Sequence, residues 1–118
     1  MDTGTQESPT IKKRSHEWID ARSLALAKAV AEKIRRDTSF LQQATENLAR
    51  WKARRTNWPK CLREWEEILS DLPVRDVLAL LVEDSEEGRR RRQSSPFTGI
   101  LTAAERKVIF EQYDAIGT

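Results

Sequence analysis

The chain has 118 residues, a net charge of +2 and one cysteine, which allows a single compact core and excludes both a second domain and an intramolecular disulfide. Charged residues make up 34% of the chain, against about 25% in typical globular domains, and hydrophobic residues make up 38%. No apolar run approaches the length of about 20 residues that crosses a bilayer, and residues 1–14 contain no apolar signal core. These features predict a cytoplasmic protein with a thin core under a charged surface.

Two parts of very different length are predicted along the chain. Residues 1–14 show no hydrophobic periodicity and include Gly4 and Pro9, so we expect a disordered arm there. Residues 15–118 are expected to form a single helical domain. Its first helix is predicted over residues 15–37, where apolar residues recur at spacings of three and four.

A second helix is predicted over residues 40–54. Ser39 and Gln42 have the spacing of a capping box at its start. The helix carries its apolar residues on one stripe, which we expect to face the core: Leu41, Ala44, Leu48 and Trp51.

Two prolines mark the starts of the next helices. Pro59 is suited to the first position of a helix over residues 59–69, and Pro73 opens another that extends to residue 83. The later helix is apolar around most of its circumference, which is typical of a helix in the centre of a fold.

Ser85 is expected to cap a short fifth helix over residues 86–93, which Pro96 ends. Two ion pairs at i,i+4 spacing are expected along it: Glu86–Arg90 and Glu87–Arg91.

Thr102 and Glu105 form a second capping box, which begins a last helix that reaches about Tyr113 and places Val108 and Ile109 inward. No alternating run or hairpin signal indicates a strand. The sequence therefore predicts an all-α protein, a compact bundle of five or six helices.

Four consecutive arginines, Arg89, Arg90, Arg91 and Arg92, are the most informative feature of the sequence. Arginine is always charged and presents a planar fork of donors, so such a cluster predicts contact with phosphates or with the carboxylates of a partner. A second interpretation has equal weight: the arginines pair with the acidic residues just before them in the chain, Glu83, Asp84, Glu86 and Glu87.

A second basic cluster lies at the end of the second predicted helix and contains Arg50, Lys52, Arg54 and Arg55. Basic residues among aromatic ones can grip nucleic acid by contacting phosphates and stacking on bases. Trp51 lies on the inward stripe and is expected in the core, whereas Trp58, in the following loop, is the better candidate for an exposed contact.

Catalytic and metal-binding residues do not form a recognisable constellation. His16 lies beside the predicted arm, and Cys61 is expected to pack as a small core residue. The acidic residues of the third predicted helix are expected to be a solvated face: Glu64, Glu66, Glu67 and Asp71. A less favoured hypothesis is that this acidic face imitates nucleic acid. We expect neither an enzyme nor a bound cofactor or metal.

Several segments resemble short bacterial proteins of two-gene loci of the toxin–antitoxin kind. The segments are Arg22-Ser-Leu-Ala, Ala29-Val-Ala-Glu-Lys-Ile-Arg35, Trp65-Glu-Glu-Ile-Leu69, Leu78-Ala-Leu-Leu-Val82, Ser85-Glu-Glu-Gly-Arg89 and Arg92-Gln-Ser-Ser-Pro-Phe-Thr-Gly-Ile-Leu101. The resemblance implies a small accessory protein that neutralises a partner. It leaves open whether the last segment touches that partner or closes the fold.

The leading hypothesis is therefore a non-enzymatic protein-binding module, an antitoxin-like inhibitor that docks on a partner protein and blocks it. The alternative is a nucleic-acid-binding protein that uses the two basic clusters as phosphate contacts. The oligomeric state is left open. The residues predicted to bind the partner are Arg54, Arg55, Trp58, Arg89, Arg90, Arg91 and Arg92.

Overall fold

The computed structural model describes residues 16–116, so the arm predicted over residues 1–14 lies outside the described residues. Within that range the protein consists of helices and connections without a strand, which confirms the predicted all-α bundle. The helices are α1 (His16–Arg36), the 3₁₀ turn η2 (Thr38–Phe40), α2 (Leu41–Ala53), α3 (Lys60–Asp71), α4 (Val74–Leu81), α5 (Glu86–Arg92) and α6 (Ala103–Ile116).

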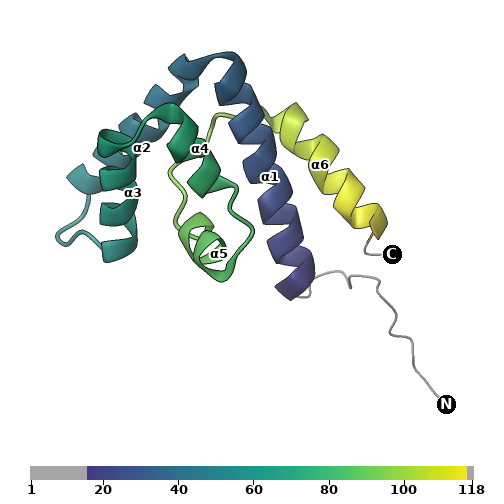
Figure 1. The fold of residues 1–118 in the computed structure, drawn as a ribbon. Coiled ribbons are helices and arrows are strands. Elements are labelled where there is room, and N and C mark those ends of the chain that lie inside the picture. The colour runs from purple at the N-terminus through teal and green to yellow at the C-terminus, as the bar shows by residue number, and fades with distance from the viewer. Residues whose placement is uncertain (1–15, 117–118) are drawn as a thin grey trace.

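The long helix α1 divides the molecule into two unequal parts (Figure 1). On one side α2 and α3 pack against each other, and α4 and α5 lie between them and α1. On the other side α6 lies along α1. The segment between α5 and α6 runs back through the molecule and connects the two parts.

The hydrophobic core lies on the side of α1 that faces α2, α3 and α4. Trp65 of α3 is fully buried, and its ring meets that of Phe97 edge to face, with centroids 5.3 Å apart and an angle of 79° between the planes. The apolar helix α4 takes the central place that its sequence predicts. The remaining buried apolar residues of this cluster are Ala27, Val30, Ala31, Ile34, Ala44, Leu48, Leu62, Val77, Leu78, Leu81, Ile100 and Leu101.

Two of the predicted helix caps are confirmed. The Ser85 hydroxyl accepts a hydrogen bond from the Gly88 backbone N–H at 3.0 Å. At the start of α6, the Thr102 N–H donates to the Glu105 carboxylate at 2.7 Å and the Glu105 N–H donates to the Thr102 hydroxyl at 3.1 Å. Both arrangements satisfy N–H groups that have no partner within the helix.

The capping box predicted for Ser39 and Gln42 is wrong. Asp37 caps instead, because its carboxylate accepts from both the backbone N–H and the hydroxyl of Ser39. That contact starts the one-turn 3₁₀ helix η2, and α2 begins only after it, at Leu41, with no side-chain cap.

Helix α6 is attached to the rest of the molecule by its contacts with α1. The Lys33 ammonium pairs with Glu105 at 2.8 Å, and the guanidinium of Arg22 lies 4.9 Å from the centre of the Phe110 ring. The prediction that Val108 points inward is wrong, since 56% of it is exposed. Phe110 is half-buried instead, one position further along the helix than Ile109.

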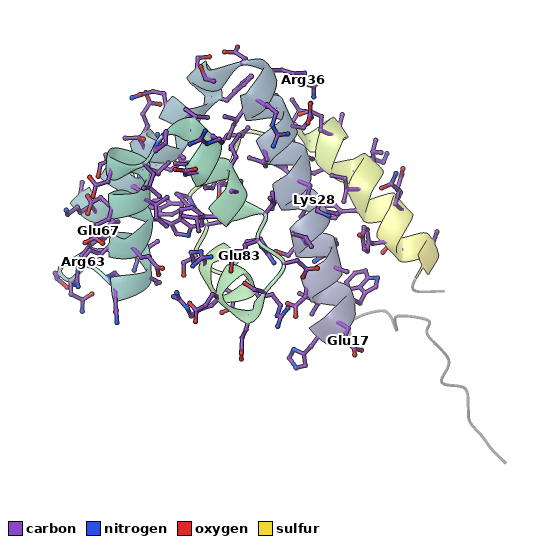
Figure 2. The ribbon with its side chains drawn as sticks, in the orientation of Figure 1. Glu17, Lys28, Arg36, Arg63, Glu67 and Glu83 are labelled. Carbon is purple, nitrogen blue, oxygen red and sulfur yellow. The ribbon has the colours of Figure 1, made fainter. Side chains whose placement is uncertain are left out.

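The charged side chains divide between an outer surface and an inner set. Figure 2 shows Arg63 and Glu67 on the outer side of α3, where both are exposed, and Glu83 beside α5. No helix among residues 16–116 is long and apolar enough to span a bilayer.

Candidate functional site

Helix α5 contains no apolar side chain, yet it packs against α1 and α4 and buries Gly88, Arg91 and Arg92. Gly88 allows this close packing, because a Cβ atom at position 88 would lie only 1.9 Å from the backbone oxygen of Glu83. The missing side chain lets the backbone of α5 approach the connection from α4. The Trp65 indole N–H donates to the Arg91 carbonyl at 2.8 Å and holds α5 against α3 as well.

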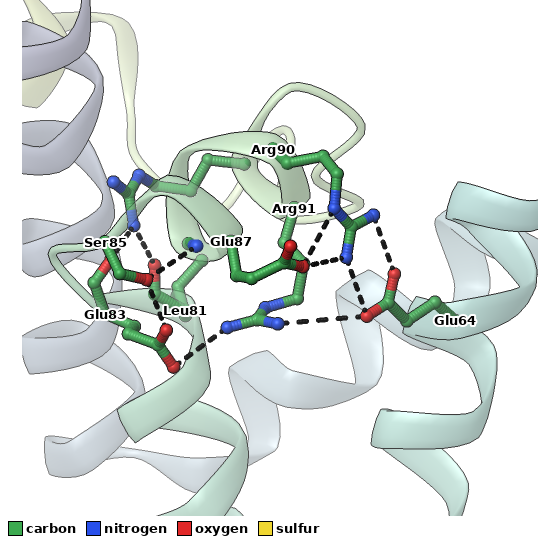
Figure 3. A network of polar contacts seen from close by, with 9 residues as sticks. Glu64, Leu81, Glu83, Ser85, Glu87, Arg90 and Arg91 are labelled. Carbon is green, nitrogen blue, oxygen red and sulfur yellow. Dashed lines mark hydrogen bonds and ion pairs between the residues drawn. The ribbon is translucent and has the colours of Figure 1, made fainter.

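Arg90 and Arg91 connect α5 to carboxylates on neighbouring elements (Figure 3). Arg90 forms a two-pronged contact with Glu64 of α3, at 3.0 and 3.2 Å, and also pairs with Glu87 at 2.7 Å. Arg91, which is 8% exposed, donates to Glu83 at 2.9 Å and lies 3.8 Å from Glu64. These contacts lower the pKa of Glu64, mainly through the hydrogen bond from Arg90.

Arg92 is 8% exposed and contacts backbone oxygens, not carboxylates. Its Nη1 donates to the carbonyls of Leu81 at 3.0 Å and Glu83 at 2.8 Å, while its buried Nε has no hydrogen-bond partner. Burial lowers the pKa of Arg92. Arg89 is the most loosely held of the four, with its Nε 3.7 Å from a carboxylate oxygen of Asp20 on α1.

The four arginines therefore leave α5 in different directions and hold it to α1, α3 and α4. Of the two interpretations of the quartet, pairing with the preceding acidic residues holds for Arg90 with Glu87 and for Arg91 with Glu83, and Arg91 and Arg92 are buried. The two expected i,i+4 pairs are wrong: Arg90 reaches Glu87, three residues before it, and Arg91 reaches Glu83 across the turn. Because α5 is short, carboxylates on neighbouring elements lie as close to its arginines as the carboxylates of α5 itself.

The second basic cluster has a different setting. A surface groove of about 620 Å³ lies between the end of α2, the start of α3 and the turn that follows α5. Its walls include an aromatic ring, aliphatic and polar groups and two guanidinium groups, contributed among others by Trp51, Arg54, Arg55, Pro59, Leu62 and Ser94. We call this the Arg54–Arg55 groove.

Arg54 and Arg55 are exposed, and neither side chain has an ion pair or hydrogen bond within residues 16–116. The nearby basic residue Lys52 differs, because it pairs with Glu66 of α3 at 3.1 Å. Arg54 and Arg55 follow the last residue of α2, where cations interact favourably with the negative end of the helix dipole. Both guanidinium groups therefore keep their donors available to another molecule.

Trp58 does not take part in this groove. Its indole N–H donates to Glu66 at 3.2 Å, and the Lys52 ammonium lies 5.6 Å from the centre of its ring. The ring is half-buried against the core, so the expectation of an exposed contact is not met. Trp51 is half-buried too, and it packs on the core while also lining the groove.

Asn47 is an element of the site that sequence reasoning missed. It is 3% exposed, and its side-chain amide donates to the carbonyls of Pro96 and Thr98, both at 2.8 Å. This side chain fixes the segment after α5 against α2. The sequence signal that could have indicated this role is a polar residue beside the inward stripe of α2, between Ala44 and Leu48.

The segment from 93 to 101 therefore has two parts. Pro96, Phe97, Ile100 and Leu101 are buried and close the core. The preceding residues line the groove, and the Ser94 hydroxyl donates to the Cys61 sulfur at 3.1 Å. Of the two roles that the sequence left open, closing the fold is confirmed, and contact with a partner stays a prediction.

Within the described part of the chain, no group of three or more histidine, cysteine, aspartate or glutamate side chains is arranged to hold a metal ion. Comparison of the whole chain with protein-family models, curated proteins and solved structures found no match. The chemistry of the Arg54–Arg55 groove is therefore the basis for a functional assignment.

Proposed function

We propose that this protein is a non-enzymatic binding module that docks on an acidic surface of a partner protein through the Arg54–Arg55 groove. In this proposal it acts as an antitoxin-like inhibitor, which covers a functional surface of its partner. One observation carries the proposal: two exposed arginines without partners within residues 16–116 flank a groove that also offers apolar contacts. Arginine beside a partly apolar groove is the combination that dominates protein–protein contacts.

The rigid surroundings of the groove support this role. Asn47 anchors the wall behind it, and Lys52 near the end of α2 pairs with Glu66 in the middle of α3. A surface that is already ordered loses little conformational freedom when a partner binds. The two guanidinium groups at the rim would speed the encounter with an acidic partner and set its orientation.

The test is co-purification with the product of the neighbouring gene at physiological salt. We expect the double variant Arg54→Glu, Arg55→Glu to lose the complex, since both contacts become repulsive. A control variant reverses the charges of Arg35 and Arg36, which are exposed in the last turn of α1. This variant should keep the complex. Loss in both double variants, or in neither, would remove the groove from the interface.

The alternative, nucleic-acid binding, rests on the same side chains with Arg50, which is also exposed. A gel-shift titration over salt separates the two. Phosphate contacts release counterions, so affinity for nucleic acid would fall steeply as salt rises. Absence of a shifted band at low salt would exclude this alternative and leave the protein partner.

A further inference from the structure

A second groove lies between α1 and the start of α6. The segment after α5 separates it from the Arg54–Arg55 groove. This second groove has a volume of about 500 Å³. Aliphatic and aromatic side chains form much of its wall, among them Leu26, Val30, Leu81, Phe97 and Leu101. Apolar walls of this extent favour the uptake of an apolar group from water.

Two arginines, Arg92 and Arg106, line the same groove. Arg106 is half-buried and its Nη1 donates to the Leu101 carbonyl at 3.2 Å. Neither guanidinium has a carboxylate within 4 Å among the described residues, so both positive charges are compensated only from a distance. In a partly desolvated setting such a charge favours the approach of an anion.

The buried Nε of Arg92 adds a second, independent sign. Like the Nε of Arg91, it is buried and has no hydrogen-bond acceptor. Buried donors in native proteins are paired in the great majority of cases. Arg91 does not line this groove, so of the two side chains only Arg92 is both incompletely hydrogen-bonded and adjacent to it.

We propose that this groove binds a small molecule in which an apolar body carries a single carboxylate, with the carboxylate facing Arg92 and Arg106. A carboxylate matches the planar fork of arginine. A dianionic phosphate carries more charge and would cost more to transfer beside apolar walls. This site is separate from the Arg54–Arg55 groove and does not depend on the proposed function.

The probe is octanoate, titrated into the full-length protein by calorimetry, with octanol as the uncharged counterpart of equal chain length. We expect saturable binding of octanoate and binding of octanol that is at least about tenfold weaker, the factor that corresponds to one charge-assisted hydrogen bond. Equal binding of both compounds, or no binding of octanoate, would overturn the proposal.

Variants locate the binding. Arg106→Gln removes one charge without touching the buried hydrogen bonds of Arg92, and Ser23→Phe fills the groove from α1. Each should weaken octanoate binding by about tenfold or more. Arg54→Gln makes the same change of charge in the other groove and should leave the affinity unchanged.

Unaltered octanoate affinity in both Arg106→Gln and Ser23→Phe would place the ligand elsewhere and refute the assignment. A short peptide ending in leucine provides a further comparison, because it offers an aliphatic group and a terminal carboxylate together. If the peptide binds more tightly than octanoate, and Arg106→Gln abolishes that binding, the ligand is the C-terminus of a protein. That result would overturn the proposal of a small molecule.

Discussion

The two arginine clusters look alike in the sequence and differ in the fold. Arg91 and Arg92 lie inside the molecule and hold α5 to its neighbours, whereas Arg54 and Arg55 are exposed and contact no acidic group within the described residues. The difference arises from their surroundings: α5 is inserted among carboxylates and open carbonyls, while the end of α2 reaches the surface. A run of basic residues thus predicts contact with acidic groups or oxygen acceptors. The fold determines whether those groups belong to the same chain or to another molecule.

The strongest test of this comparison prevents the close approach of α5 to the connection from α4. Gly88→Ala would place a Cβ atom 1.9 Å from the Glu83 oxygen, which is a backbone atom and cannot turn away. We expect a loss of about 3 kcal/mol or more in the free energy of unfolding, or failure to fold, measured by chemical denaturation. Stability close to that of the unchanged protein would show that α5 can sit further from α4.

The direct comparison exchanges one arginine of each kind for alanine. Arg92→Ala leaves the carbonyls of Leu81 and Glu83 without their donor, and we expect a cost of about 2–3 kcal/mol. Arg54→Ala should change stability by no more than about 0.5 kcal/mol. Similar unfolding midpoints for the two variants would contradict the division into a structural and a surface cluster.

Asn47→Ala tests the wall that the two grooves share. The variant leaves the Pro96 and Thr98 carbonyls without the amide donor, and we expect a loss of about 1–3 kcal/mol in unfolding free energy. Amide hydrogen exchange should increase first in the segment after α5. Gln43→Ala, one turn earlier on the same helix, is the matched control, because the Gln43 amide donates to the Asn47 side chain. Equal exchange in both variants would remove Asn47 as the anchor.

The smallest expected effect concerns the flank formed by α6. The Lys33 ammonium, with help from the Thr102 N–H, lowers the pKa of Glu105 to about 2 from its ordinary value of 4.5. Because the folded protein holds the charged form, the pair stabilises α6 above the ordinary pKa and loses this effect as the pH falls toward 2. The protection factors of the α6 amides, which are exchange rates corrected for their intrinsic dependence on pH, should therefore fall on acidification.

Glu105→Gln should remove most of that pH dependence in α6, whereas Glu111→Gln, on the exposed side of the same helix, should keep it. The pKa values of Glu64 and Glu83 are lowered as well, so acid also weakens the carboxylates that hold α5. Protection factors of α6 that do not change with pH in the unchanged protein would show that Lys33 and Glu105 do not hold the flank.

Much of the architecture was predictable because its signals are local. Hydrophobic spacing indicated the helices other than α5, which its cap at Ser85 and Pro96 marked, and the caps at Ser85 and Thr102 depend on residues three positions apart. Two assignments were wrong: Asp37 displaced Ser39 as a cap, and Val108 was placed inward although it is exposed on α6, which packs along α1.

The sequence by itself determined an all-helical domain and the presence of two basic clusters, because helix periodicity, caps and charge are properties of neighbouring residues. Only the tertiary structure decided which arginines are buried, which carboxylates they meet and which residues line a common groove. Those outcomes depend on contacts such as Arg90 with Glu64 and Asn47 with Pro96, which join residues 26 and 49 positions apart. No local pattern encodes a distance of that kind, since it results from the packing of the whole chain.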